Sequence, residues 1–188
     1  MANGAFWGVT RGIVHGIAAH RVLAGPGPEV DCVSDPDPRC YERADEERDR
    51  WGRQRTLSAL AFSVGEGLAA LAWTKALDAS AGDAHLVGIV SDFGAGLAPV
   101  AGVLVAGDGL EETAAWGLVL AGAATGIPAG VGLRNARDHS WGDAEVFRMA
   151  GLLGGLTGAT AADLLGAGDE RLFAGLVLAG AVGGLVLG

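Results

Sequence analysis

The segment Thr113–Leu133, TAAWGLVLAGAATGIPAGVGL, is 21 residues long and carries no charged side chain. A helix rises about 1.5 Å per residue, so this segment is long enough to cross the roughly 30 Å hydrocarbon core of a membrane. Its glycines at 122, 126 and 130 recur every four residues, and residues at this spacing share one face of a helix. The segment therefore predicts a transmembrane helix with one face of small residues.

Five other apolar segments have a similar length: residues 4–23, 57–76, 86–106, 146–165 and 172–188. We expect about six crossings, with a range of four to six. A transmembrane β-barrel would need short segments that alternate apolar and polar residues, and the sequence shows none. We predict an all-α, polytopic membrane helical bundle that forms a single domain over residues 1–188. Its three hairpins would span residues 1–76, 86–133 and 146–188.

The 33 glycines of the chain are arranged largely in rows with a four-residue period. Such small-xxx-small rows let the backbones of two membrane helices approach closely. We predict that the rows pack helices together, within the bundle or between subunits. The alternative is that a composition rich in glycine and alanine produces such rows unselected. The packing residues are Gly4, Gly8, Gly12, Gly16, Gly94, Gly102, Gly122, Gly126, Gly130, Gly151, Gly155, Gly180 and Gly184.

One heptapeptide occurs twice in the chain. Residues 117–123, GLVLAGA, are identical to residues 175–181, and residues 92–95 align loosely with 152–155. The offsets of 58 and 60 residues predict that a helical hairpin is repeated with the same orientation in the membrane. The alternative is a coincidence of low-complexity sequence.

Most of the charge lies in residues 25–56, between the first two apolar segments. The net charge is −9, and this stretch holds nine acidic residues, six arginines and four of the six prolines. It predicts a solvated acidic loop, in which residues 43–55 could form a short polar helix. The acidic balance argues against a nucleic-acid partner, because binding phosphates requires a basic surface.

The positions of the basic residues predict the orientation of the bundle. Lys75, Arg134 and Arg137 lie at the loops that share a side with both termini, and the positive-inside rule places that side in the cytoplasm. The loop 25–56 then lies outside. There Cys32 and Cys40 could form a disulfide bond, because bonds of this kind persist in oxidising compartments.

Five charged residues fall within or near apolar segments, where a charge is costly and usually faces a partner or water. One hypothesis pairs Arg11 with an acidic residue of segment 86–106 or 146–165. A second hypothesis is a proton or ion path that uses Glu66, Asp92, Asp163 and His15. The alternative is a set of ion pairs without a transport role. The five residues are Arg11, Glu66, Asp92, Arg148 and Asp163.

The sequence lacks the short motifs of common enzyme sites. It has no GxxxxGK[ST] loop, no HExxH pair, no CxxC pair and no GxSxG elbow. The four histidines are scattered along the chain. We therefore expect no enzymatic activity, no cofactor and no metal site.

Two neighbouring stretches resemble known families. Residues 137–144, RDHSWGDA, followed by residues 150–155, AGLLGG, resemble uncharacterised glycine-rich (glycine-zipper) multi-pass proteins of bacteria. That resemblance implies a helical membrane protein with no known activity. We expect the protein to lie in the bacterial inner membrane. The spacing of Asp143, Ala150, Gly151 and Gly155 is also similar to the end of the signature of the Tim17/Tim22/Tim23 translocase family. His139 stands where that family has an arginine.

From the sequence, the expected function is that of a non-enzymatic integral membrane protein. It would be a structural or assembly subunit, packing through its glycine rows with itself as a homo-oligomer or with the subunits of a membrane complex, in contact with lipid. One alternative is a small channel or transporter that uses the acidic residues near the membrane midplane. Another is a soluble helical bundle rich in glycine and alanine.

Overall fold

The computed structural model describes residues 2–33, 37–76 and 78–188. These residues form six α-helices and one short 3-10 helix, and none of them lies in a strand. The prediction of an all-helical fold is therefore confirmed. In chain order the elements are α1 (Ala2–Ala24), α2 (Cys40–Ala76), α3 (Ala81–Ala106), η1 (Gly107–Gly109), α4 (Glu112–Ala136), α5 (Trp141–Leu164) and α6 (Glu170–Leu187).

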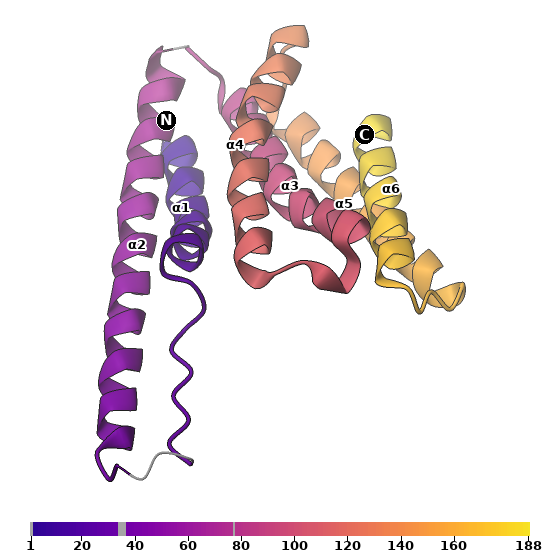
Figure 1. The fold of residues 1–188 in the computed structure, drawn as a ribbon. Helices are drawn as coiled ribbons and strands as arrows, with labels where there is room; N and C mark the ends of the chain where they lie inside the picture. Colours follow the sequence, from indigo (N-terminus) through magenta and orange to yellow (C-terminus); the bar gives the residue numbers. More distant parts are fainter. Residues whose placement is uncertain (1, 34–36, 77) are drawn as a thin grey trace.

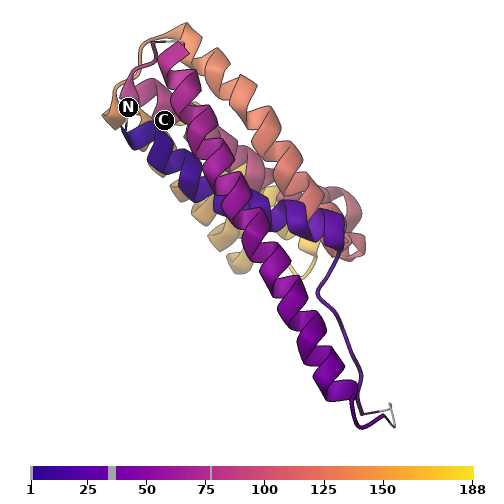
Figure 2. The same cartoon turned by 90° about the vertical axis from the view of Figure 1, so that its left-hand side faces the viewer.

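Consecutive helices pack against each other in pairs. α1 contacts α2, α3 contacts α4 and α5 contacts α6, while α3 also contacts α1, α5 and α6. Figure 1 shows the α1–α2 pair on one side of the bundle and the α5–α6 pair on the other, with α3 and α4 between them. Both termini lie toward the same end of the bundle (Figures 1 and 2).

The acidic region extends beyond the opposite end of the bundle as an arm, which comprises residues 25–33 and 37–50 (Figure 2). The predicted loop 25–56 is corrected here, because α2 begins at Cys40 and continues without a break to Ala76. No proline occurs between Pro38 and Ala76, so nothing in this stretch interrupts the helix. A disulfide bond joins Cys32 to Cys40 and ties the arm to the first turn of α2.

Two helices begin with the same capping motif. The Ser80 hydroxyl accepts a hydrogen bond from the backbone N–H of Asp83, and the Asp83 carboxylate accepts one from the backbone N–H of Ser80. Ser140 and Asp143 do the same at the start of α5. Such a capping box satisfies backbone donors that the first helical turn leaves unpaired, which explains why α3 begins five residues before the predicted apolar segment.

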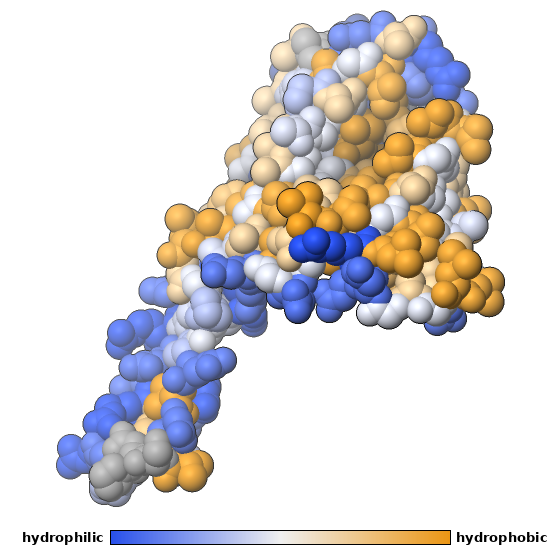
Figure 3. All heavy atoms as spheres, turned by 45° about the vertical axis from the view of Figure 1, so that its right-hand side comes forward, coloured by the Kyte–Doolittle hydropathy of each residue, from blue (hydrophilic) through white to orange (hydrophobic). Residues whose placement is uncertain are grey.

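The bundle buries small side chains and exposes large ones. Among the described residues, eight of the twelve buried hydrophobic residues are alanines, and Leu86, Ile89 and Ala144 form a buried apolar cluster. Large apolar side chains cover the outside of the helices instead, a distribution that water would penalise. Figure 3 shows this apolar surface over the bundle and a hydrophilic arm below it. Examples are Leu57, Leu60, Val64, Leu68, Leu152, Leu153, Leu156 and Leu172.

Four of the described helices are long and apolar enough to cross a membrane: α2, α3 extended through η1, α4 and α6. This number lies at the lower end of the predicted range. The helices α1 and α5 do not belong to this group, and both carry several ionisable side chains. Those of α1 are Arg11, His15, His20 and Arg21, and those of α5 are Asp143, Glu145, Arg148 and Asp163.

Candidate functional site

An ion pair links the first helix to the third at the middle of both. Arg11 Nε donates to Asp92 Oδ1 at 2.5 Å. The Arg11 side chain is 14% exposed and the Asp92 side chain 46%. The guanidinium lies directly against the backbone of Gly88, one turn before Asp92, where any side chain would occupy its place. Of the two partners hypothesised for Arg11, the structure therefore selects the acidic residue of segment 86–106.

A second polar pair lies one helical turn further along α1. His15 Nδ1 and Glu66 Oε1 are 2.6 Å apart, and they join α1 to α2. The His15 side chain is 10% exposed and that of Glu66 is 30% exposed. Because residues 11 and 15 are four apart, both pairs extend from the same face of α1.

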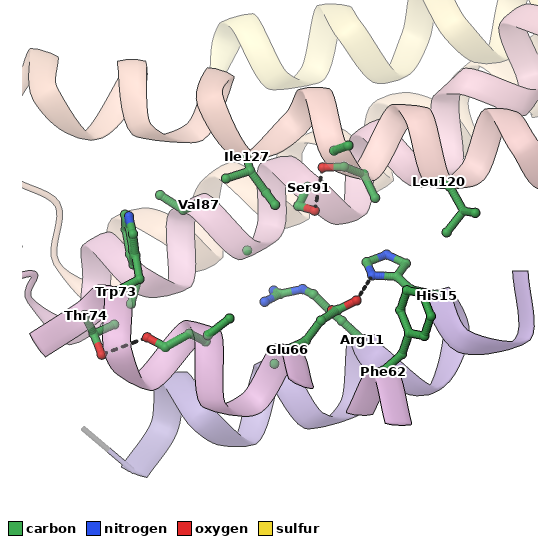
Figure 4. A pocket seen from close by; sticks show the side chains of 17 residues that line it. Arg11, His15, Phe62, Glu66, Trp73, Thr74, Val87, Ser91, Leu120 and Ile127 are labelled. Carbon is green, nitrogen blue, oxygen red and sulfur yellow. Dashed lines mark hydrogen bonds and ion pairs between the residues drawn. The ribbon is translucent and has the colours of Figure 1, made fainter. Parts of the chain in front are cut away.

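This face of α1 borders a cavity of about 560 Å³ between the α1–α2 pair and the α3–α4 pair. Figure 4 shows Arg11, His15 and Glu66 on one side of it, facing Val87 and Ile127 on the other. Its lining also includes the aromatic side chains of Phe62 and Trp73 and the alanines 69, 70, 123 and 124. The volume falls within the usual range for small-molecule sites.

The uncharged polar groups of the cavity are bonded to backbone. The Ser91 hydroxyl donates to the carbonyl of Ala123 at 3.0 Å, and the Thr74 hydroxyl donates to the carbonyl of Ala70 at 2.9 Å. The charged and ionisable part of the lining consists of Arg11, His15 and Glu66, all on one side. The cavity therefore has an apolar body and one polar wall, an arrangement that can hold and orient a small amphipathic molecule.

Asp163 does not join this cluster, although the sequence hypothesis placed it on the same path. It is exposed one residue before the end of α5, whereas Arg11, Glu66 and Asp92 occupy the middle of their apolar stretches. Of the residues of the hypothesised path, Glu66, Asp92, Asp163 and His15, only His15 and Glu66 line the cavity.

Many of the predicted packing glycines lie against the backbone of the other helix of their own pair. A Cβ atom added at Gly8 would lie 2.6 Å from the carbonyl oxygen of Glu66, and one added at Gly16 would lie 2.5 Å from Ala59 Cα. Gly12 approaches Ser63, and the Ser63 hydroxyl donates to the carbonyl of Val9 at 2.7 Å.

The other two pairs make similar contacts. Gly126 faces Ser91 Cα and Gly130 faces Val87 Cα, at 2.6 and 2.7 Å from the added Cβ. Backbone contacts also join Gly94 to Gly122, Gly154 to Gly180 and Gly184 to Ala150, while Gly102, Gly151 and Gly155 meet the side chains of Leu118, Phe93 and Ala181. The surroundings of Gly4 lie outside the described residues.

Sequence reasoning missed a third polar group, formed where α3 and α5 begin. His85 is 2% exposed, its ring stacks on Trp141 at 3.8 Å, and its Nε2 lies 2.6 Å from Glu145 Oε1. The sequence carried one signal for this group. His85 follows the motif Ser-x-Gly-Asp of residues 80–83, and Glu145 follows the same motif in residues 140–143 at the same distance.

At the end of the bundle near the arm, α1 is held to α2 and α4 by a further group. Arg21 pairs with Glu112 at 2.8 Å and also lies over the ring of Trp51. Arg55, one helical turn after Trp51 in α2, contacts the same ring. These contacts attach α1 to its neighbours beyond the cavity.

Comparisons of the chain with family models, with curated proteins and with solved structures found no match. Among the described residues no group of three or more His, Cys, Asp or Glu side chains is placed to hold a metal ion. The feature of this chain that indicates a function is therefore the cavity with its charged wall.

Proposed function

We propose that this chain is a non-enzymatic integral membrane protein that moves a small solute across the bilayer, as a small transporter or channel. The observation that supports this proposal is that Arg11, His15 and Glu66 line one cavity between two helix pairs. Asp92 of α3 pairs with Arg11 next to this cavity. Ionisable side chains at mid-membrane depth are costly, and they commonly mark solute or ion pathways.

The proposed location is the bacterial inner membrane. Four helices of sufficient length and the exposed leucines around the bundle support an integral membrane protein. We place both termini in the cytoplasm and the arm outside. The Cys32–Cys40 disulfide supports this orientation, because such bonds are rare in the cytosol.

We also propose that α3–α4 and α5–α6 are two copies of one hairpin. The two capping boxes stand 60 residues apart, in residues 80–83 and 140–143. Each pair also contains a glycine–glycine backbone contact at corresponding positions: Gly94 with Gly122, and Gly154 with Gly180.

Reconstitution tests the proposed transport. The purified full chain would be inserted into liposomes, and the flux of protons and of a panel of neutral, anionic and cationic small solutes would be measured. Asp92→Asn removes the charged partner of Arg11 with little change of shape, so we expect the flux to fall about tenfold or more. Asp163→Asn, outside the cavity, is the matched control and should leave the flux unchanged.

Absence of flux for every solute with the unsubstituted chain would refute the transport proposal. Release of the protein from membranes by high salt without detergent would refute its integral membrane location, and would favour the soluble bundle.

A second candidate function is that of a structural or assembly subunit. The inward-facing glycine rows already contact other helices of the same chain. At Gly96, Gly117 and Gly183, in contrast, an added Cβ atom would meet open space. These surface positions favour contact with a helix of another subunit. A discrete oligomer or complex in mild detergent, combined with no flux in liposomes, would support this candidate over the first.

A further inference from the structure

The polar cluster at the cavity comprises Arg11, His15 and Glu66 of the lining and Asp92, which pairs with Arg11 without lining the cavity itself. This cluster has more acidic than basic groups. Arg11 contributes one positive charge, while Glu66 and Asp92 contribute two negative charges when ionised. His15 is the remaining ionisable group in contact with this set, and it bonds to Glu66 through Nδ1. Without a proton on His15 or on a carboxylate, the cluster has a net charge of −1.

A net charge at this depth is unfavourable, because the surrounding helices and lipid solvate ions poorly. One additional cation balances the cluster. The His15 ring nitrogen and the Glu66 carboxylate oxygen lie 2.6 Å apart, so a proton shared between them can supply that charge. A positively charged ligand next to Glu66 can supply it equally well.

The rest of the lining suits a hydrophobic cation better than a hydrated metal ion. Phe62 and Trp73 present aromatic rings to the cavity, and Leu120, Val87 and Ile127 present aliphatic side chains. Aromatic faces attract organic cations, and this attraction is strongest where water is excluded. Apolar walls of this kind offer few of the oxygen ligands that a small metal cation requires.

We propose that the cavity binds a hydrophobic organic monocation beside Glu66, in exchange for the proton that the His15–Glu66 pair holds when the cavity is empty. This inference rests on the proposed transport function and names its substrate class. When the cation enters, the proton leaves the pair to water, and the total charge of the cluster is unchanged. When the cation departs, a proton from water returns to the pair.

The neighbours of this pair are consistent with a single exchangeable charge. Arg11 on α1, one helical turn before His15, is paired with Asp92 on α3. The part of α4 that lines the cavity is uncharged, and the Arg21–Glu112 pair toward the arm is neutral as a unit. The His15–Glu66 pair is therefore the group whose charge changes on exchange.

Binding of tetraphenylphosphonium to the full chain in detergent tests this inference. Equilibrium dialysis would measure affinity, and a pH indicator in weak buffer would measure proton release. We expect saturable binding with about one proton released per cation near neutral pH, a consequence of the charge balance. Glu66→Gln should weaken binding about 10–100-fold, since it removes a charge-assisted contact.

Two further variants keep the test interpretable. Glu66→Asp retains the charge and should retain proton-coupled binding, which separates loss of charge from loss of fold. Asp163→Asn changes an acidic residue outside the cavity and should bind as the unsubstituted chain does.

Binding without proton release would overturn the exchange. Equal binding by Glu66→Gln and the unsubstituted chain would overturn the placement of the cation. If neutral or anionic solutes cross liposomes in an Asp92-dependent manner while tetraphenylphosphonium does not bind, the cation inference fails and the transport proposal stands. If no solute crosses and none binds, the transport proposal itself fails.

Discussion

Replacing Gly12 with alanine should separate α1 from α2. A Cβ atom at this position would lie 2.5 Å from the carbonyl oxygen of Phe62 and from the backbone nitrogen of Ser63. Contacts of this kind normally occur at 3.4 Å or more, so the two helices must move apart by about 1 Å. The obstacle is backbone, which cannot rotate away as a flexible side chain can.

The energetic cost follows from what this movement disrupts. Overpacking of a close contact costs about 1–3 kcal/mol. The hydroxyls of Ser63 and Ser58 donate across the same interface, to the carbonyls of Val9 and Gly16 at 2.7 and 2.9 Å. Each such bond contributes about 0.6 kcal/mol between membrane helices. We therefore expect Gly12→Ala to lower the free energy of unfolding by about 2–4 kcal/mol.

Unfolding of the purified chain in mixed micelles, driven by increasing mole fractions of SDS and followed by tryptophan fluorescence, measures this loss. Gly65→Ala is the matched control, because Gly65 lies in the same helix pair and has open space at the Cβ position. That variant should be neutral or more stable by up to about 1 kcal/mol, the helix propensity difference. Equal stability of the two variants would refute the close-packing argument.

Two further predictions concern the junction of α3 and α5. His85→Ala should lower the unfolding free energy by about 2–4 kcal/mol in the same micelle assay, because it removes the stack on Trp141 and leaves Glu145 without that partner; His85→Phe should recover part of the loss, and no recovery would count against the stacking. The backbone N–H and hydroxyl of Ser140 hold the pKa of Asp143 below its usual value, so the capping box stabilises α5 above the ordinary carboxyl pKa and loses this effect as the pH falls through the lowered pKa. Asp143→Asn should therefore destabilise the protein at neutral pH and match the unsubstituted chain in strong acid, whereas a difference that persists in acid would show that the carboxylate is not the cause.

The helical class of this protein is readable from the sequence because it depends on local properties. Long apolar runs rich in glycine and alanine, such as 113–133, form helices wherever the backbone must satisfy its own hydrogen bonds. The boundaries were less accurate at the ends of the apolar runs. The charge-rich stretch 40–56 extends α2 at its start, and the Ser80 cap does the same for α3. Hydrophobicity alone does not detect such polar helical turns.

The candidate site was predicted in part. Charges inside apolar segments identified Arg11, Glu66 and Asp92 as residues that need partners, since each would be costly alone. Asp163 met the same criterion but lies exposed near the end of α5. His85 was not singled out, because its partners Trp141 and Glu145 lie about 60 residues away in the chain.

The sequence by itself determined the helices, the small-residue faces and the set of charges that cannot remain unpaired in an apolar environment. Only the tertiary structure decided which helices use those faces and which charges meet. Gly8, Gly12 and Gly16 lie against α2, which brings His15 to Glu66, and the bare backbone at Gly88 leaves room for Arg11 to reach Asp92. The physical reason is that periodicity fixes the direction of a side chain around its own helix, whereas the partner in that direction depends on how separate helices pack.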